Sequence, residues 1–252
     1  MSAAKRKNGD FLLAVEGLTV SFDGFKAVDD LSFYLDPQEI RVIIGPNGAG
    51  KTTVLDLICG KTKATSGSIK FAGKELTKLK EHQIVHAGVG RKFQTPSVFE
   101  DLTVFENLEV SYPQGHSVMG ALAFKRDLAV VEEVEAVAKK IFLDDLLDQP
   151  AALLSHGQKQ WLEIGMLLIQ KPELIMLDEP VAGMSVAERQ KTAELLKMIT
   201  KDHTVLVIEH DMQFVGDIAD RVTVMHQGKV LSEGSIEHVK ADPKVIEVYL
   251  GH

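Results

Sequence analysis

One stretch of eight residues limits the fold of this chain more than any other feature. It reads GPNGAGKT, from Gly45 to Thr52, and fits the pattern G-x-x-x-x-G-K-[ST]. The β-branched run IRVIIG (40–45) predicts a short buried strand, and KTTVLDLICG (51–60) predicts a helix directly after the loop. A strand, a glycine-rich loop and a helix in this order favour a phosphate-binding loop over a glycine-rich turn without a ligand.

The residue types in this loop suit a nucleoside triphosphate with magnesium. Glycines let backbone N–H groups surround the β-phosphate, and the helix that follows adds the positive end of its dipole. Lys51 would reach the β- and γ-phosphates, and the Thr52 hydroxyl would coordinate Mg²⁺. We therefore expect ATP and Mg²⁺ as cofactors. The expected nucleotide contacts are Gly45, Pro46, Asn47, Gly48, Ala49, Gly50, Lys51, Thr52 and Thr53.

Two later apolar runs place acidic and imidazole groups at predicted strand ends. In ELIMLDEP (173–180), Asp178 emerges where open α/β sheets bind ligands, and we expect it to hold the magnesium shell. Glu179 could orient and deprotonate the attacking water, although strand-end carboxylates can also be mere helix caps. His210 ends HTVLVIEH (203–210), where its imidazole could touch the γ-phosphate. The expected catalytic residues are Glu179, His210 and Lys51.

The order of these elements predicts an α/β fold. Strands that alternate with helices indicate a mostly parallel sheet, and the shorter alternating patterns before Ile40 and at 67–73 indicate an antiparallel β layer. Residues 95–150 show no convincing strand and contain the charged amphipathic stretch 123–142, which predicts a helical subdomain. The predicted organisation is a disordered basic tail at 1–10 and a single domain at 11–252, with the α/β core at 11–94 and 151–252.

Composition excludes several classes of protein. A net charge of −8 argues against nucleic acid as a partner, because phosphate binding needs a positive surface. The single cysteine, Cys59, rules out an intramolecular disulfide and fits a reducing compartment. No apolar run approaches the roughly 18 residues that span a bilayer, so a role at a membrane must depend on a partner.

The stretch LSHGQ (154–158) completes a set of motifs that resembles the nucleotide-binding subunit of an ATP-binding-cassette (ABC) transporter, over nearly the whole chain. The resemblance implies a P-loop NTPase fold in which two cassettes meet head to tail and share ATP. It implies that Gln94 contacts nucleotide and metal, so the expected metal ligands are Thr52, Gln94 and Asp178. It places the switch histidine at His210 and the aromatic adenine platform at Phe22, with Val28 as a further nucleotide contact. The signature residues expected to act on the partner's ATP are Ser155, His156, Gly157 and Gln158.

Two departures from the family pattern indicate one branch of it. His156 replaces the first signature glycine, and Ser185 in VAGMS (181–185) stands where the family usually has an aspartate. These features, with the ending DPKVIEVYLG (242–251), resemble the branch that imports branched-chain amino acids, amides and urea. The segment at 88–110 is most similar to the ATP-binding subunits of urea transporters. We therefore expect a urea importer, with a branched-chain amino acid importer as the alternative.

The resemblance also implies partners and a location. They are a second cassette, identical or paralogous, two integral membrane permease subunits and, indirectly, a solute-binding protein, at the cytoplasmic face of the membrane. Three other classes are less consistent with the sequence. A serine hydrolase would need the G-x-S-x-G elbow that Ser155 lacks. A P-loop kinase would not need the signature. An ABC ATPase acting on nucleic acid or ribosomes typically carries basic surfaces, coiled coils or a second cassette.

Overall fold

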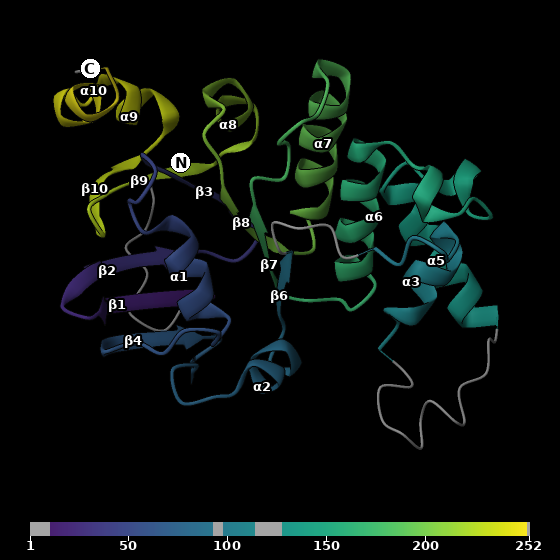
Figure 1. The fold of residues 1–252 in the computed structure, drawn as a ribbon, viewed down its shortest axis with the longest axis horizontal. Coiled ribbons are helices and arrows are strands. Elements are labelled where there is room, and N and C mark those ends of the chain that lie inside the picture. The colour runs from purple at the N-terminus through teal and green to yellow at the C-terminus, as the bar shows by residue number, and fades with distance from the viewer. Residues whose placement is uncertain (1–10, 93–97, 114–127, 251–252) are drawn as a thin grey trace.

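The computed structural model describes residues 11–92, 98–113 and 128–250 (Figure 1). The predicted basic tail and Gln94 therefore lie outside the described residues, as do 114–127 of the predicted helical subdomain. The described chain forms two sheets, with helices packed between and around them. Among the described residues, no helix is both long and apolar enough to cross a membrane.

The larger sheet has six strands and confirms the predicted mixed, mostly parallel core. Its strand order is β10-β9-β3-β8-β7-β6, and every neighbouring pair is parallel except β10 with β9. Strands β3, β7 and β8 are buried at every residue, as their continuous apolar runs predict. The bounds are β3 Ile40–Ile44, β6 Val89–Lys92, β7 Leu174–Asp178, β8 Thr204–Ile208, β9 Arg221–His226 and β10 Lys229–Gly234.

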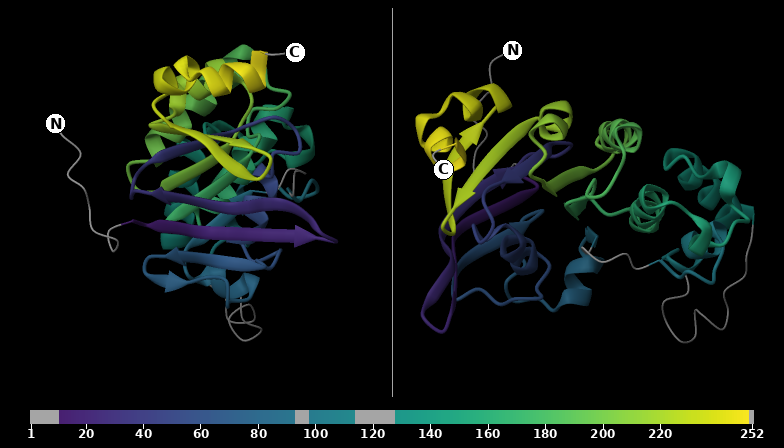
Figure 2. Two further views of the ribbon diagram at one scale, coloured as in Figure 1. Left: turned by 90° about the vertical axis from the view of Figure 1, so that its left-hand side faces the viewer. Right: turned by 45° about the horizontal axis from the view of Figure 1, so that its top comes forward.

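The smaller sheet is the predicted antiparallel layer, with the strand order β2-β1-β4-β5. Helix α1 (Lys51–Ile58) lies between the two sheets, because its buried residues share one apolar cluster with both of them. Figure 2 shows this arrangement from two further sides. The phosphate loop, which joins β3 to α1, is thus anchored in the core at both ends. The bounds are β1 Leu13–Phe22, β2 Phe25–Leu35, β4 Ser66–Phe71 and β5 Lys74–Glu75.

Helices cover the other face of the large sheet and form a separate group at one end of the molecule (Figure 1). Within the described part of 95–150, α3 (Val104–Val110) and α5 (Leu128–Lys140) pack on each other and on α6 (His156–Leu168). The other helices among the described residues are α2 Glu81–His86, α7 Val186–Ile199, α8 Met212–Ile218, α9 Ile236–Ala241 and α10 Pro243–Leu250, with 3₁₀ turns at Asp144–Leu146 and Ala151–Leu153. The exact boundaries of the helical subdomain stay a prediction.

Candidate functional site

The phosphate loop is shaped by glycine positions that no other residue fits. Gly50 has φ 96° at the N-cap of α1, and a Cβ there would overlap the carbonyl oxygen of Ala27. The Lys51 ammonium donates to the carbonyl oxygens of Gly45 (2.8 Å) and Pro46 (3.1 Å). The lysine side chain therefore folds back over the loop, in the place where phosphate oxygens would be received.

Strand β2 supports the loop from beneath. Gly228 donates its N–H to the carbonyl of Ala49, and Asp29 donates to the carbonyl of Gly228. Val28 has no exposed surface and belongs to the same buried cluster as Ala49. The predicted nucleotide contact from Val28 is therefore corrected. Its side chain lies in the apolar core, so it supports the loop and does not face a ligand.

Asp178 emerges at the end of β7 beside the first turn of α1, as expected. Asp178 is 2% exposed and its carboxylate is hydrogen-bonded to the Thr52 side chain, while Oδ2 accepts no hydrogen bond from any described residue. Burial raises the pKa of Asp178, and the Thr52 bond and the Arg91 guanidinium, 3.9 Å from Oδ2, partly oppose that rise. A buried carboxylate oxygen without a donor, next to a threonine hydroxyl, fits Mg²⁺, which uses few protein ligands and completes its shell with water and phosphate oxygens.

Lys51 belongs to the same charged group. Burial lowers the pKa of the Lys51 ammonium, and the carboxylates of Glu179 and Asp178 act in the opposite direction. The loop lysine, the strand-end aspartate and the following glutamate are therefore close enough to interact. The sequence predicted these three residues in one site, and the structure brings them together.

Glu179 and His210 come from neighbouring strands and meet at the sheet edge. Glu179 adopts a left-handed backbone (φ 49°), and its N–H donates to the carbonyl of Ile208. His210 Nδ1 lies 3.5 Å from Glu179 Oε1, and the Glu179 side chain is 30% exposed. The predicted general base and switch histidine thus face solvent as a pair, where an attacking water could be held.

Glu209 is a residue of this site that motif reasoning missed. Its carboxylate is 1% exposed and accepts N–H bonds from Val181, His210 and Asp211. It thereby ties the loop after Glu179 to the loop that carries His210. Burial raises the pKa of Glu209, and these three backbone bonds oppose the rise. The readable signal was a carboxylate at the end of an otherwise apolar strand.

The stretch LSHGQ opens α6, as the sequence predicts. Ser155 is the N-cap, its hydroxyl accepts the N–H of Gln158, and Gln158 Oε1 accepts the N–H of Ser155. His156 lies on a neighbouring turn of its own chain, with Nε2 3.1 Å from the carbonyl oxygen of Ala182 and the ring beside Gly183. Ser155 and His156 are exposed. Because Ser155 serves as a helix cap, the structure offers no nucleophile elbow there.

The predicted adenine platform lies on the hairpin of the antiparallel sheet. Phe22 pairs with Phe25 at the end of the β1–β2 hairpin, and the two residues are 49% and 69% exposed. An exposed ring at this end is available for stacking, and the predicted role stays a prediction.

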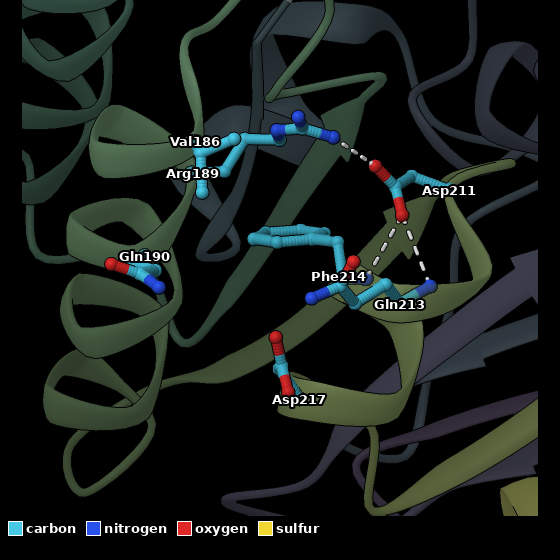
Figure 3. Close-up of a pocket in the computed structure, with 7 residues that line it drawn as sticks. All are labelled: Val186, Arg189, Gln190, Asp211, Gln213, Phe214 and Asp217. Atoms are coloured by element: carbon cyan, nitrogen blue, oxygen red, sulfur yellow. Dashed lines mark hydrogen bonds and ion pairs between the residues drawn. The ribbon is translucent and has the colours of Figure 1, made fainter.

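A small cavity lies where α7 and α8 meet, and it is too small for a nucleotide (Figure 3). Its volume of about 40 Å³ admits only a few water molecules. Arg189 on α7 forms an ion pair with Asp211, which also caps α8 by accepting the N–H groups of Gln213 and Phe214. Asp211 follows His210 directly, so this ion pair holds the loop that carries His210 against α7. The lining residues are Val186, Arg189, Gln190, Asp211, Gln213, Phe214 and Asp217.

Comparison with known proteins agrees with this geometry. Residues 28–182 match the ABC transporter family, and residues 229–252 match the branched-chain amino acid ATP-binding cassette transporter family. The chain therefore belongs to the ABC transporter family, as an ATP-hydrolysing cassette.

Individual relatives indicate which branch of the ABC transporter family this chain resembles. The chain is 38% identical over 251 residues to the high-affinity branched-chain amino acid transport ATP-binding protein LivG of Escherichia coli K12, covering 95% of this chain and 98% of LivG. It is 36% identical over 250 residues to BraF of Pseudomonas aeruginosa, covering 95% and 98%. A nucleotide-free ATP-binding cassette from an ABC transporter superposes with a TM-score of 0.84 at 33% identity, covering 96% and 100%. These relatives support the branched-chain amino acid branch, and none of them points to urea.

Proposed function

We propose that this chain is the ATPase subunit of an importer for branched-chain amino acids. The observation that carries the proposal is the match of the C-terminal segment 229–252 to the branched-chain cassette family, together with end-to-end similarity to LivG and BraF. The predicted alternative thus replaces the predicted urea importer as the main reading. Urea or a related amide stays a second candidate, supported by the resemblance of residues 88–110 alone.

The residues of the site have complementary roles in ATP hydrolysis. The phosphate loop and Lys51 bind the phosphates, and Asp178 and Thr52, joined by Gln94, would hold Mg²⁺. The ion, when bound, neutralises charge on the β- and γ-phosphate oxygens. Glu179 accepts a proton from the attacking water, and His210, 3.5 Å away, orients Glu179 and the γ-phosphate. Glu209 keeps the two loops that carry this pair in register.

The signature turn acts on a second nucleotide. Ser155, Gly157 and the neighbouring residues at the start of α6 would bind the γ-phosphate of ATP held by a partner cassette, since a helix N-terminus favours an anion. Closure of the two cassettes then depends on ATP, and hydrolysis releases them. We propose a paralogous or identical second cassette, two permease subunits and a solute-binding protein as partners, at the cytoplasmic face of the membrane.

The permease subunits are proposed to dock near Phe99. Its ring is 50% exposed, while its backbone N–H and carbonyl are both hydrogen-bonded to the buried side chain of Asn107. A fixed backbone that presents an exposed aromatic ring suits a docking surface. Phe99→Asp should leave the cassette folded and should abolish co-purification with the membrane subunits.

The test of the transported solute is a deletion of the gene followed by uptake measurements. Loss of high-affinity leucine uptake with urea uptake intact supports the proposal. The reverse result would transfer the chain to the urea side of the branch. In both arms, a copy of the gene carrying Glu179→Gln should fail to restore uptake.

A further inference from the structure

The start of α6 already holds an anion, and that anion belongs to the chain itself. Ser155 Oγ donates a hydrogen bond of 3.1 Å to Oε1 of Glu188, which lies in the first turn of α7. A Cβ added at Gly157 would overlap the same carboxylate, coming within 2.6 Å of its Cδ. The Glu188 carboxylate therefore lies across the turn formed by Ser155 and Gly157.

Helix capping explains only half of this arrangement. Glu188 is the third residue of a capping box on α7, in which its Oε2 accepts the N–H (2.9 Å) and the hydroxyl (2.8 Å) of Ser185. The cap is complete with that one oxygen. The other oxygen reaches a different helix, 33 residues earlier in the chain.

The carboxylate is charged at neutral pH. The hydrogen bonds from Ser185, followed by that from Ser155 and the field of His156, hold the pKa of Glu188 below its usual range. The side chain is only half-buried, so it has room to leave Ser155 without unfolding α7. An ionised, movable side chain thus occupies the place where the proposed function puts a partner's γ-phosphate.

We propose that Glu188 competes with the γ-phosphate of the partner's ATP for the signature turn, so that closure of the cassettes requires its carboxylate to leave Ser155. This inference rests on the proposed function of Ser155 and Gly157. The Glu188 carboxylate and a γ-phosphate cannot both bind the Ser155 hydroxyl at the start of α6, because two negative charges in contact with one hydroxyl repel each other. Glu188 therefore raises the ATP concentration at which the cassettes close, and it satisfies the signature turn while no nucleotide is present.

The test is Glu188→Gln in the assembled transporter, with ATPase rate measured against ATP concentration. With its one carbonyl oxygen glutamine can keep the capping box on α7, and it removes the charge together with the oxygen that accepts from Ser155. The half-saturating ATP concentration should fall roughly threefold to tenfold in the variant. The difference from wild type should shrink as salt rises from about 0.05 to 0.3 M, because salt screens repulsion between partly exposed charges.

Two controls separate this effect from a change in helix stability. Glu106 makes the same capping box with Thr103 on α3, so Glu106→Gln should leave half-saturation unchanged. Binding of ATP to the isolated cassette, measured by calorimetry, should be equal in Glu188→Gln and wild type, because it reports the phosphate loop alone. Should Glu188→Gln not assemble, Glu188→Ala with Glu106→Ala as its control gives the same comparison.

The outcomes are distinct. An unchanged or higher half-saturating concentration in an active Glu188→Gln complex overturns the competition and leaves the proposed function standing. A wild-type complex that hydrolyses no ATP overturns the proposed function, and this inference with it.

Discussion

The phosphate loop and the signature turn both lie at the start of a helix and are both proposed to bind phosphate, but they are held in different ways. The phosphate loop is fixed by backbone: Gly50 packs against the Ala27 carbonyl, and Ala49 is bonded to Gly228. The signature turn is held by side chains, with Ser155 bonded to Glu188 and His156 resting on Ala182.

This difference bears on how each site works. Contacts between backbone groups in a close-packed core have no alternative arrangement, so the phosphate loop is formed before nucleotide arrives. Partly exposed side-chain hydrogen bonds are worth little and can be exchanged for others. The chain's own ATP would thus meet a rigid site, and the partner's ATP would meet an adjustable one.

Glu179→Gln should have the largest effect. It should lower ATP turnover by changing only the rigid site, which contains the phosphate loop, and should leave the signature turn intact. The amide cannot accept the proton of the attacking water, so ATP turnover in the assembled transporter should fall by about 10² to 10⁴. In the isolated cassette, ATP binding should persist, and the closed, ATP-bound dimer should accumulate, as measured by size-exclusion chromatography with light scattering. Near-normal turnover in this variant would remove Glu179 from the chemistry.

Lys51→Ala should affect binding itself. The ammonium supplies charge-assisted bonds to phosphate, and their loss should weaken ATP affinity roughly tenfold to a hundredfold in an equilibrium titration. Thermal unfolding without nucleotide should change little. If Lys51→Ala bound ATP like wild type and lost only turnover, the backbone N–H groups of the loop would bind the phosphates without help from the lysine.

The sequence predicted the rigid site far better than the adjustable one. The loop, Asp178, Glu179 and His210 occur in motif order at strand ends, so apolar periodicity and local spacing were enough to place them. Glu188 and Glu209 act through partners 33 and 28 residues away in the chain, and no local pattern specifies those contacts. The S-x-x-E spacing of Ser185 and Glu188 is typical of a capping box, which the sequence prediction did not include, and that spacing carries no information about the contact with Ser155.

The fold, too, was predictable where a local sequence pattern specifies an element and not where contacts between distant residues do. The apolar strands β3, β7 and β8 were evident, whereas β6 (VGRK) was not, because two of its four residues are cations. Arg91 and Lys92 enter the sheet through ion pairs with Asp56 and Glu163, which lie on other elements. Burial through such pairs leaves no hydrophobic signal.

Asp178→Asn tests the rigid site through the thermal stability of the protein. Burial raises the pKa of Asp178, so the folded protein binds this proton more tightly than the unfolded chain, and stability from this group is lost as pH rises through the folded pKa. The uncharged amide avoids that loss. Without Mg²⁺ and nucleotide, the variant should melt roughly 2–4 °C higher than wild type at pH 8, and the difference should shrink as pH falls toward 4. A variant that melts lower at pH 8 would mean that Thr52 and Arg91 stabilise the carboxylate by more than its burial costs.

His156→Gly should have the smallest effect, because it removes one contact from the adjustable site without touching its anion-binding atoms. Ser155 and Gly157 remain, and α6 keeps its cap. The lost hydrogen bond to Ala182 holds the turn that follows Glu179, so kcat in the assembled transporter should fall roughly two- to fivefold with KM nearly unchanged. His156→Gln can still donate to the Ala182 carbonyl, and its rate should lie between those of His156→Gly and wild type. Loss of nearly all activity in an intact His156→Gly complex would show that the signature turn is as rigidly specified as the phosphate loop, and the contrast between the two sites would fail.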